Sequence, residues 1–200
     1  MSVMSLREVR GDPNIWKRGR FAVPTFCGWP AVMEYHKQCP TPEIAGLFSV
    51  LFETGCRISE ALQLHREMFV YEAPFLKVYR LPVMKKKERA PIGDRFRNIS
   101  IPLQEPLVEP MMKYVESKPG RLFSRSRVWA WRKIVEVDDR WWPHRIRSER
   151  ATQLNLEYGF DISKLMKWFN WVEAKEAQEY VRLDMRDLEK AMMDRLKSHN

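Results

Sequence analysis

The sequence predicts a mainly α-helical protein with one small antiparallel β-sheet. Capping signals flank an apolar run between Thr41 and Gly55, and two stretches rich in β-branched and aromatic residues, 75–83 and 97–103, are separated by a charged hairpin. After residue 103, apolar residues recur at helical spacing. A hydrophobic fraction of 44% over 200 residues is enough for a packed core in one domain, with room for a small attachment.

The first predicted helix begins at Thr41, whose hydroxyl can cap it, and ends at Gly55. A proline and a glutamate follow Thr41, and both residue types suit a first helical turn. A second short helix is expected to begin near Ser59. Residues 1–40 carry scattered prolines, glycines and basic residues, so we expect an irregular basic arm or short lead-in, with order beginning near Trp29.

The two β-rich stretches are expected to pair as antiparallel strands across the hairpin KKKERAPIGDRF. Helices are then expected over 106–115, 124–135, 144–158 and 162–169, the third of them ended by a glycine. A last helix is expected over 184–198, because it carries a one-sided apolar stripe of Leu188, Met192 and Leu196.

The charge balance points to a polyanionic partner. The formal net charge is +9 and the sequence pI is about 9.6, which is typical of a protein that binds nucleic acid. A basic membrane-surface protein is the alternative, but no lysine-rich amphipathic helix with a bare apolar face stands out. No run approaches eighteen apolar residues, and the N-terminus lacks the apolar core of a secretory signal.

The three cysteines, Cys27, Cys39 and Cys56, form neither an even set nor a zinc-binding spacing. We therefore expect reduced thiols and no metal site, as in the host cytoplasm or nucleoid.

Two segments carry the candidate chemistry. "PHRIRSERAT", from Pro143, places His144 and Arg147 one turn apart on a helix, although such a segment taken alone is ordinarily a solvated basic face or a general DNA contact. "TGCRISEAL", from Thr54, places Arg57 in a turn between two helices, where Glu60 can hold its guanidinium. Taken alone, this second segment is ordinarily a surface salt bridge.

Together with "YGFDISKLMKWFNW" and the tyrosine of "QEYV", these segments closely resemble the tyrosine recombinase (phage integrase) family, in order and in spacing, from about Thr41 to Tyr180. The resemblance implies the family's catalytic-domain fold, which is related to type IB topoisomerases. It also implies that the protein cuts and rejoins duplex DNA through a covalent 3′-phosphotyrosyl intermediate, without metal, ATP or another cofactor. A virus, a plasmid or another mobile element is the source that it suggests.

The resemblance assigns a role to each matching residue. Arg57 and Arg147 would clamp the scissile phosphate, and His144 would accept or position the proton of the nucleophile, Tyr180. Trp171 stands where most members of the family have histidine, and its indole N–H would donate to the phosphate. The alternatives are a core aromatic for Trp171 and an ordinary half-buried tyrosine for Tyr180.

The family also uses a lysine on the β-hairpin. We assign this role to Lys85, the first lysine after the apolar end of the strand, with Lys86 and Lys87 as DNA-backbone contacts or solvated charge. The helix from Ser124 is the candidate for the major groove. The arginines expected to contact DNA are Arg125, Arg127, Arg132 and Arg145.

The expected organisation is a basic arm over 1–40 without a full core-binding domain, a catalytic domain over 41–182 and a C-terminal helix over 183–200. That helix would pack either on a neighbouring protomer or on its own core. The expected partners are duplex DNA, further copies in a dimer to tetramer on DNA, and an accessory protein that completes the clamp around DNA. Two alternatives remain: a catalytically silent DNA-binding accessory or regulatory protein, and a type IB topoisomerase-like enzyme that only cuts and religates one strand.

Overall fold

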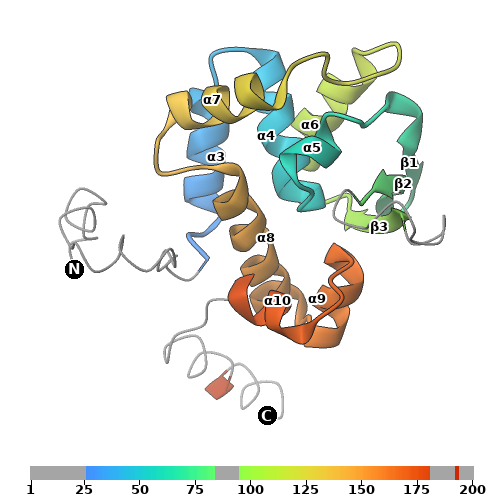
Figure 1. Ribbon diagram of the computed structural model, residues 1–200, viewed down its shortest axis with the longest axis vertical. Coiled ribbons are helices and arrows are strands. Elements are labelled where there is room, and N and C mark those ends of the chain that lie inside the picture. The colour runs from blue at the N-terminus through green and yellow to red at the C-terminus, as the bar shows by residue number, and fades with distance from the viewer. Residues whose placement is uncertain (1–25, 84–94, 181–191, 194–200) are drawn as a thin grey trace.

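The structure, a computed structural model, describes residues 26–83, 95–180 and 192–193. It is mainly helical with one three-stranded antiparallel sheet, which confirms the predicted fold class (Figure 1). The strands are β1 (Phe69–Glu72), β2 (Phe75–Pro82) and β3 (Phe96–Pro102). The α-helices are α3 (Trp29–Gln38), α4 (Pro42–Thr54), α5 (Ile58–Ala61), α6 (Val108–Glu116), α7 (Arg127–Val137), α8 (Pro143–Tyr158), α9 (Ile162–Phe169) and α10 (Ala174–Tyr180), and a 3-10 turn, η1, covers Arg66–Met68.

Helix α4 is the centre of the main hydrophobic core, and its two ends are those that the sequence predicts. The Thr41 hydroxyl accepts the N–H of Ile44 at 3.3 Å, and Gly55 ends the helix in the left-handed region at φ 60°. Every residue from Gly46 to Thr54 is buried. Because α3, α6, α7 and α8 all pack on it, α4 fixes the position of the turn that follows it.

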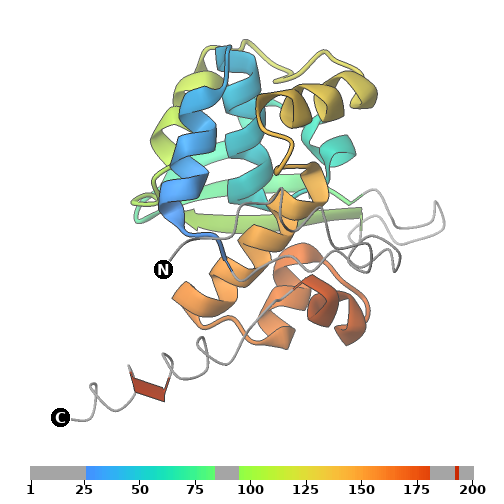
Figure 2. The same ribbon diagram turned by 90° about the vertical axis from the view of Figure 1, so that its left-hand side faces the viewer.

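Residues 29–38 form helix α3, which confirms that order begins near Trp29 and corrects the expectation that the irregular lead-in continues to residue 40. This helix begins with a proline in its first turn and lies beside α4 (Figure 2). The Tyr35 ring packs against that of Phe48 of α4, with 4.2 Å between the ring centroids, and its hydroxyl donates to the carbonyl of Ile134 at 2.7 Å. Tertiary packing therefore stabilises a helix in a segment that local signals mark as irregular.

The sheet has the order β1-β2-β3, and the predicted strands are β2 and β3. Strand β1 was not predicted: its four residues pair with β2 from Phe69 opposite Val78 to Glu72 opposite Phe75. The hairpin between β2 and β3 lies outside the described residues over 84–94.

Helix α8 crosses from the α7 side of the molecule to the end where α9 and α10 lie (Figure 1). It does not present a solvated basic face, because Arg145, Arg147 and Arg150 are at most 6% exposed. A second, smaller cluster of buried residues joins α8 to α9 and α10: Ala151, Leu154, Leu165, Phe169, Trp171 and Ala177. Helix α9 has the predicted bounds, whereas the helix predicted over 184–198 lies outside the described residues except at 192–193.

Candidate functional site

The turn between α4 and α5 carries the first candidate arginine. The Thr54 hydroxyl accepts the N–H of Cys56 at 3.1 Å, which fixes the turn. Arg57 then caps α5: its backbone N–H donates to Glu60 Oε2 at 2.8 Å and its guanidinium donates to Oε1 at 3.0 Å. The predicted pairing with Glu60 is confirmed. The Arg57 side chain remains 16% exposed, so it is anchored and still reachable from solvent.

Arg147 reaches the same turn from α8. Its guanidinium donates to the carbonyl of Gly55 and, at 3.4 Å, to that of Phe169 at the end of α9. The guanidinium carbon lies 4.5 Å from the centroid of the Phe169 ring and 5.3 Å from that of Trp171. Arg147 is 1% exposed. From a buried position on α8, it therefore joins the end of the following helix, α9, to the α4–α5 turn, which is 92 residues away in the sequence.

A glycine at position 55 permits this close packing. A Cβ atom there would lie 2.3 Å from Cε1 of Phe169, so any larger residue would displace the ring. The Phe169 ring in turn stacks on Trp171 at 4.4 Å and 21°. Trp171 is 5% exposed, so it is both a buried aromatic and a neighbour of the Arg147 guanidinium.

Arg97 is a further residue of this site that the sequence analysis missed. It lies on β3, is 7% exposed, and donates to the carbonyl of Thr54 at 3.2 Å and to that of Trp168. Burial lowers its pKa to about 10, so it remains charged at neutral pH. The alternation of the strand gives a signal that could have found it, because Arg97 shares the buried face of β3 with Ile99 and Ile101.

The site has more positive than negative charge. Burial raises the pKa of the Cys56 thiol to about 12; the negative charge of Glu60 acts in the same direction, whereas Arg97 and Arg147 oppose it. Arg57 adds to the lowering of the Arg97 pKa. The hydrogen bonds place the three guanidinium groups and the Glu60 carboxylate at one turn, since Arg97 donates to Thr54, Arg147 to Gly55 and Arg57 to Glu60. Such a cluster suits an anion with several oxygens, such as a phosphodiester.

Of the other candidate catalytic residues, His144 and Tyr180 lie on helices and the hairpin lysines are not described. His144 is exposed in the first turn of α8, one turn before Arg147. Tyr180 is the last residue of α10, a helix that packs against α8 and α9. Lys85, Lys86 and Lys87 lie outside the described residues.

The arginines expected to contact DNA divide into two groups. Arg127 and Arg132 are exposed on α7. Arg125 precedes α7 rather than lying on it, and its guanidinium pairs with Glu43 at 3.1 Å and lies 4.9 Å from a ring centroid of Trp129. Arg127 and Arg132 are therefore open to a ligand, whereas Arg125 is already engaged within the protein.

Arg145 belongs to the interior. It is 6% exposed and donates to Glu149 at 3.1 Å and to the carbonyl of Arg140 at 2.7 Å. Its guanidinium carbon also lies 5.1 Å from a ring centroid of Trp141. These contacts hold the start of α8, so we leave Arg145 out of the DNA-binding surface proposed below.

The family model described as "Phage integrase family" matches residues 30–187. This chain belongs to the phage integrase family. Among curated proteins, none matches the sequence.

Two solved recombinases and a solved transposon integrase share the fold of this phage integrase family member. XerA recombinase is 18% identical over 86% of this chain, with a TM-score of 0.66. XerH recombinase bound to difH substrate is 16% identical over 86% of this chain, with a TM-score of 0.59. The Tn1549 transposon integrase in complex with circular intermediate DNA is 15% identical over 87% of this chain, also with a TM-score of 0.59. The chain spans 65%, 56% and 67% of those proteins, respectively.

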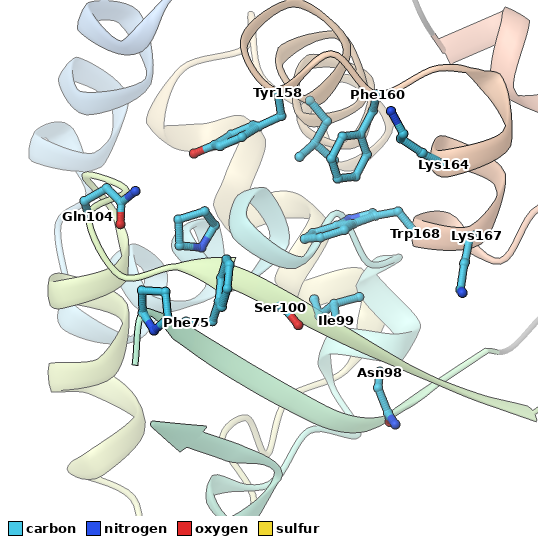
Figure 3. A pocket seen from close by; sticks show the side chains of 13 residues that line it. Phe75, Asn98, Ile99, Ser100, Gln104, Tyr158, Phe160, Lys164, Lys167 and Trp168 are labelled. Carbon is cyan, nitrogen blue, oxygen red and sulfur yellow. The ribbon is translucent and has the colours of Figure 1, made fainter. Parts of the chain in front are cut away.

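A cavity of about 640 Å³ lies beside the arginine cluster, between the sheet and helices α8 and α9 (Figure 3). Phe75 and Ile99 line it from the sheet, and Phe160 and Trp168 line it from the helical side. Because its lining is largely apolar and aromatic, the arginine cluster, and not this cavity, is the candidate site for a phosphodiester in this integrase family member. No helix among the described residues is long and apolar enough to span a membrane.

Proposed function

We propose that this chain cuts and rejoins duplex DNA through a covalent 3′-phosphotyrosyl intermediate on Tyr180. The observation that carries the proposal is the convergence of Arg57, Arg147 and Trp171. Arg147 of α8 donates to the carbonyl of Gly55, two residues before Arg57, and to that of Phe169, two residues before Trp171, and its guanidinium lies beside the Trp171 ring. The family membership over residues 30–187 supports the same reaction.

The two arginines would neutralise the charge that develops on the non-bridging oxygens of the phosphate. Arg57 is already partly exposed and is held by Glu60, so its free N–H groups can meet an oxygen without rearrangement. Arg147 would exchange its bond to Phe169, which at 3.4 Å is long for a hydrogen bond, for a bond to the phosphate. Trp171 would donate its indole N–H from the same side.

The proposed reaction makes one bond to phosphorus and breaks another. The Tyr180 hydroxyl oxygen would attack phosphorus and release its proton to His144, while the bond from phosphorus to the 5′-oxygen breaks. Lys85 would give that oxygen a proton. Attack by a 5′-hydroxyl on the phosphotyrosine reverses the step, so the phosphodiester is restored without a further energy source.

Binding to duplex DNA is supported by the net charge of +9 and by the exposed arginines of α7, Arg127 and Arg132. The similar XerH structure is bound to difH substrate, and the similar Tn1549 integrase structure is a complex with circular intermediate DNA. We assign the catalytic domain to residues 41–182 and propose assembly on DNA as a dimer to tetramer. In that assembly, an accessory protein would complete the clamp, and residues 183–200 would pack either on a neighbouring protomer or on their own core.

A second candidate function is DNA binding without cleavage. The burial of Arg147 favours it, since a guanidinium that is 1% exposed and bonded to two carbonyls is not yet open to a phosphate. With that function, the chain would bind a recombination site on DNA and regulate recombination there without cutting the DNA.

A covalent-trapping assay separates the two. The substrate is a set of nicked duplexes that represent the DNA flanking the gene, and the variants are Tyr180→Phe and, as a matched control, Tyr158→Phe. We expect an adduct that resists denaturation with the wild type and with Tyr158→Phe, and none with Tyr180→Phe. Salt-sensitive duplex binding without an adduct would support the second candidate function. The absence of both an adduct and DNA binding would contradict both candidate functions for the isolated chain.

A further inference from the structure

Arg97 and Arg147 bridge the same two backbone segments at successive residues. Arg97 donates to the carbonyls of Thr54 and Trp168. Arg147 donates to the next carbonyl in each segment, those of Gly55 and Phe169. The α4–α5 turn and the end of α9 are thus held together by two adjacent guanidinium bridges, one from the sheet and one from α8.

The ring of Phe169 lies beside both bridges. The guanidinium carbons of Arg97 and Arg147 lie 5.8 Å and 4.5 Å from its centroid, and Gly55 is in direct contact with the ring. Cation–π attraction and the two carbonyl bonds therefore act on each arginine together. These contacts offset the free-energy cost of removing the Arg97 charge from water, since the side chain is only 7% exposed.

The two bridges have different tasks once DNA is bound, if the proposed function holds. Arg147 has to turn from a carbonyl to the phosphate, so its bridge weakens at the moment when the site must be rigid. Arg97 is not among the residues assigned to the phosphate, so its bridge can persist.

We infer that Arg97 is a positioning residue for DNA cleavage. It holds the Arg57 turn and the segment leading to Trp171 at a fixed separation while Arg147 engages the phosphate. This inference rests on the proposed function.

The chemistry of the side chain is specific to arginine. Its planar fork donates along two fixed directions, to Thr54 on one side and to Trp168 on the other. A lysine at position 97 would keep the charge, but its single ammonium is a point donor and cannot hold both carbonyls in the same geometry. Arg97→Lys should therefore recover only part of what Arg97→Gln loses.

The test is the single-turnover rate of adduct formation at saturating nicked duplex. It compares a normal scissile phosphate with a methylphosphonate, in which a methyl group replaces one charged non-bridging oxygen. A misplaced arginine clamp matters less for the uncharged substrate. We expect Arg97→Gln to slow cleavage of the phosphate about 100-fold, Arg97→Lys to slow it about tenfold, and the ratio of the phosphate rate to the methylphosphonate rate to fall in both, as it does in Arg57→Gln.

The matched control is Arg121→Gln, because Arg121 also donates to a backbone carbonyl, that of Leu62 at 2.9 and 2.7 Å, outside the cluster. It should leave the rate ratio at the wild-type value. If Arg97 only stabilised the fold, fewer molecules would be active, so the amplitude of adduct formation would fall on both substrates and the ratio of the two rate constants would stay at the wild-type value. An unchanged ratio in Arg97→Gln or Arg97→Lys would therefore overturn the inference. If Arg97→Gln does not fold, the ratio in Arg97→Lys decides. A wild type that forms no adduct on either substrate would instead refute the proposed function.

Discussion

Replacement of Gly55 by alanine tests the packing on which the site depends. The new Cβ would lie 2.3 Å from Cε1 of Phe169, and the residue would have to keep a φ of +60°. Gly159 is a matched control, because it also ends a helix, at φ +61°, yet nothing lies within 4 Å of the position that its Cβ would take. The two substitutions share the backbone cost and differ in the steric contact.

The magnitudes follow from these two terms. The left-handed conformation costs a non-glycine residue roughly 1–2 kcal/mol, and the stiffer unfolded chain offsets about 0.4–1 kcal/mol of this at both positions. Overpacking against the Phe169 ring adds about 1–3 kcal/mol at position 55 alone. We therefore expect Gly55→Ala to lower the free energy of unfolding by about 1–3 kcal/mol more than Gly159→Ala does.

Urea unfolding followed by tryptophan fluorescence, with Tm as a second readout, measures this difference. For a chain of this size, each 1 kcal/mol corresponds to roughly 2–4 °C in Tm. Gly55→Ala should also slow adduct formation, because the displaced ring borders the Arg147 guanidinium. Equal losses of stability in the two variants would refute the close contact between Gly55 and Phe169.

Three further predictions concern the buried charges and the DNA-binding surface. Burial raises the pKa of Glu149 above its usual value, so the folded state holds the proton more tightly, and the stability contributed by this group is lost as pH rises above about 4.5. Between about pH 4 and pH 7, the free energy of unfolding should therefore fall less in Glu149→Gln than in the wild type. A steeper fall in the variant would contradict this. Arg150→Met leaves Glu53 and Glu105 buried without their cation, so it should lower the free energy of unfolding in urea by about 3–5 kcal/mol. A loss below about 1 kcal/mol would contradict this. Replacing Arg127 and Arg132 of α7 by alanine should make the dependence of log affinity for duplex DNA on log salt shallower, with a slope smaller in magnitude by about two. An unchanged slope would show that α7 does not contact the DNA.

The elements predicted best are those whose ends are set by local chemistry. Helix α4 needs only the Thr41 hydroxyl at its start and Gly55 at its end, and both are visible in the sequence. Helix α3 and strand β1 depend instead on partners distant in sequence. Tyr35 of α3 is held by Phe48 and Ile134, and β1 exists because it pairs with β2, so local signals did not reveal them.

The site divides in the same way. The pairing of Arg57 with Glu60 spans three residues of one capped helix and was therefore predictable. The burial of Arg147 was not, because its partners are backbone carbonyls that only the tertiary fold brings to it. Arg145 pairs with Glu149 four residues on in the same helix, but the fold buries that pair, and Glu149 also accepts the backbone N–H of the distant Cys27. Arg97 was missed because the sequence motifs do not include it, although the alternation of β3 placed it on the buried face.

The proposed phosphotyrosyl linkage is tested most directly by mapping the covalent bond between protein and DNA. The adduct trapped on a nicked duplex would be digested with protease and nuclease, and the nucleotide-bearing peptide would be sequenced by mass spectrometry. We predict a single modified peptide with the nucleotide linked through its 3′-phosphate to Tyr180. A nucleotide on another residue, or a linkage through the 5′-phosphate, would contradict the account.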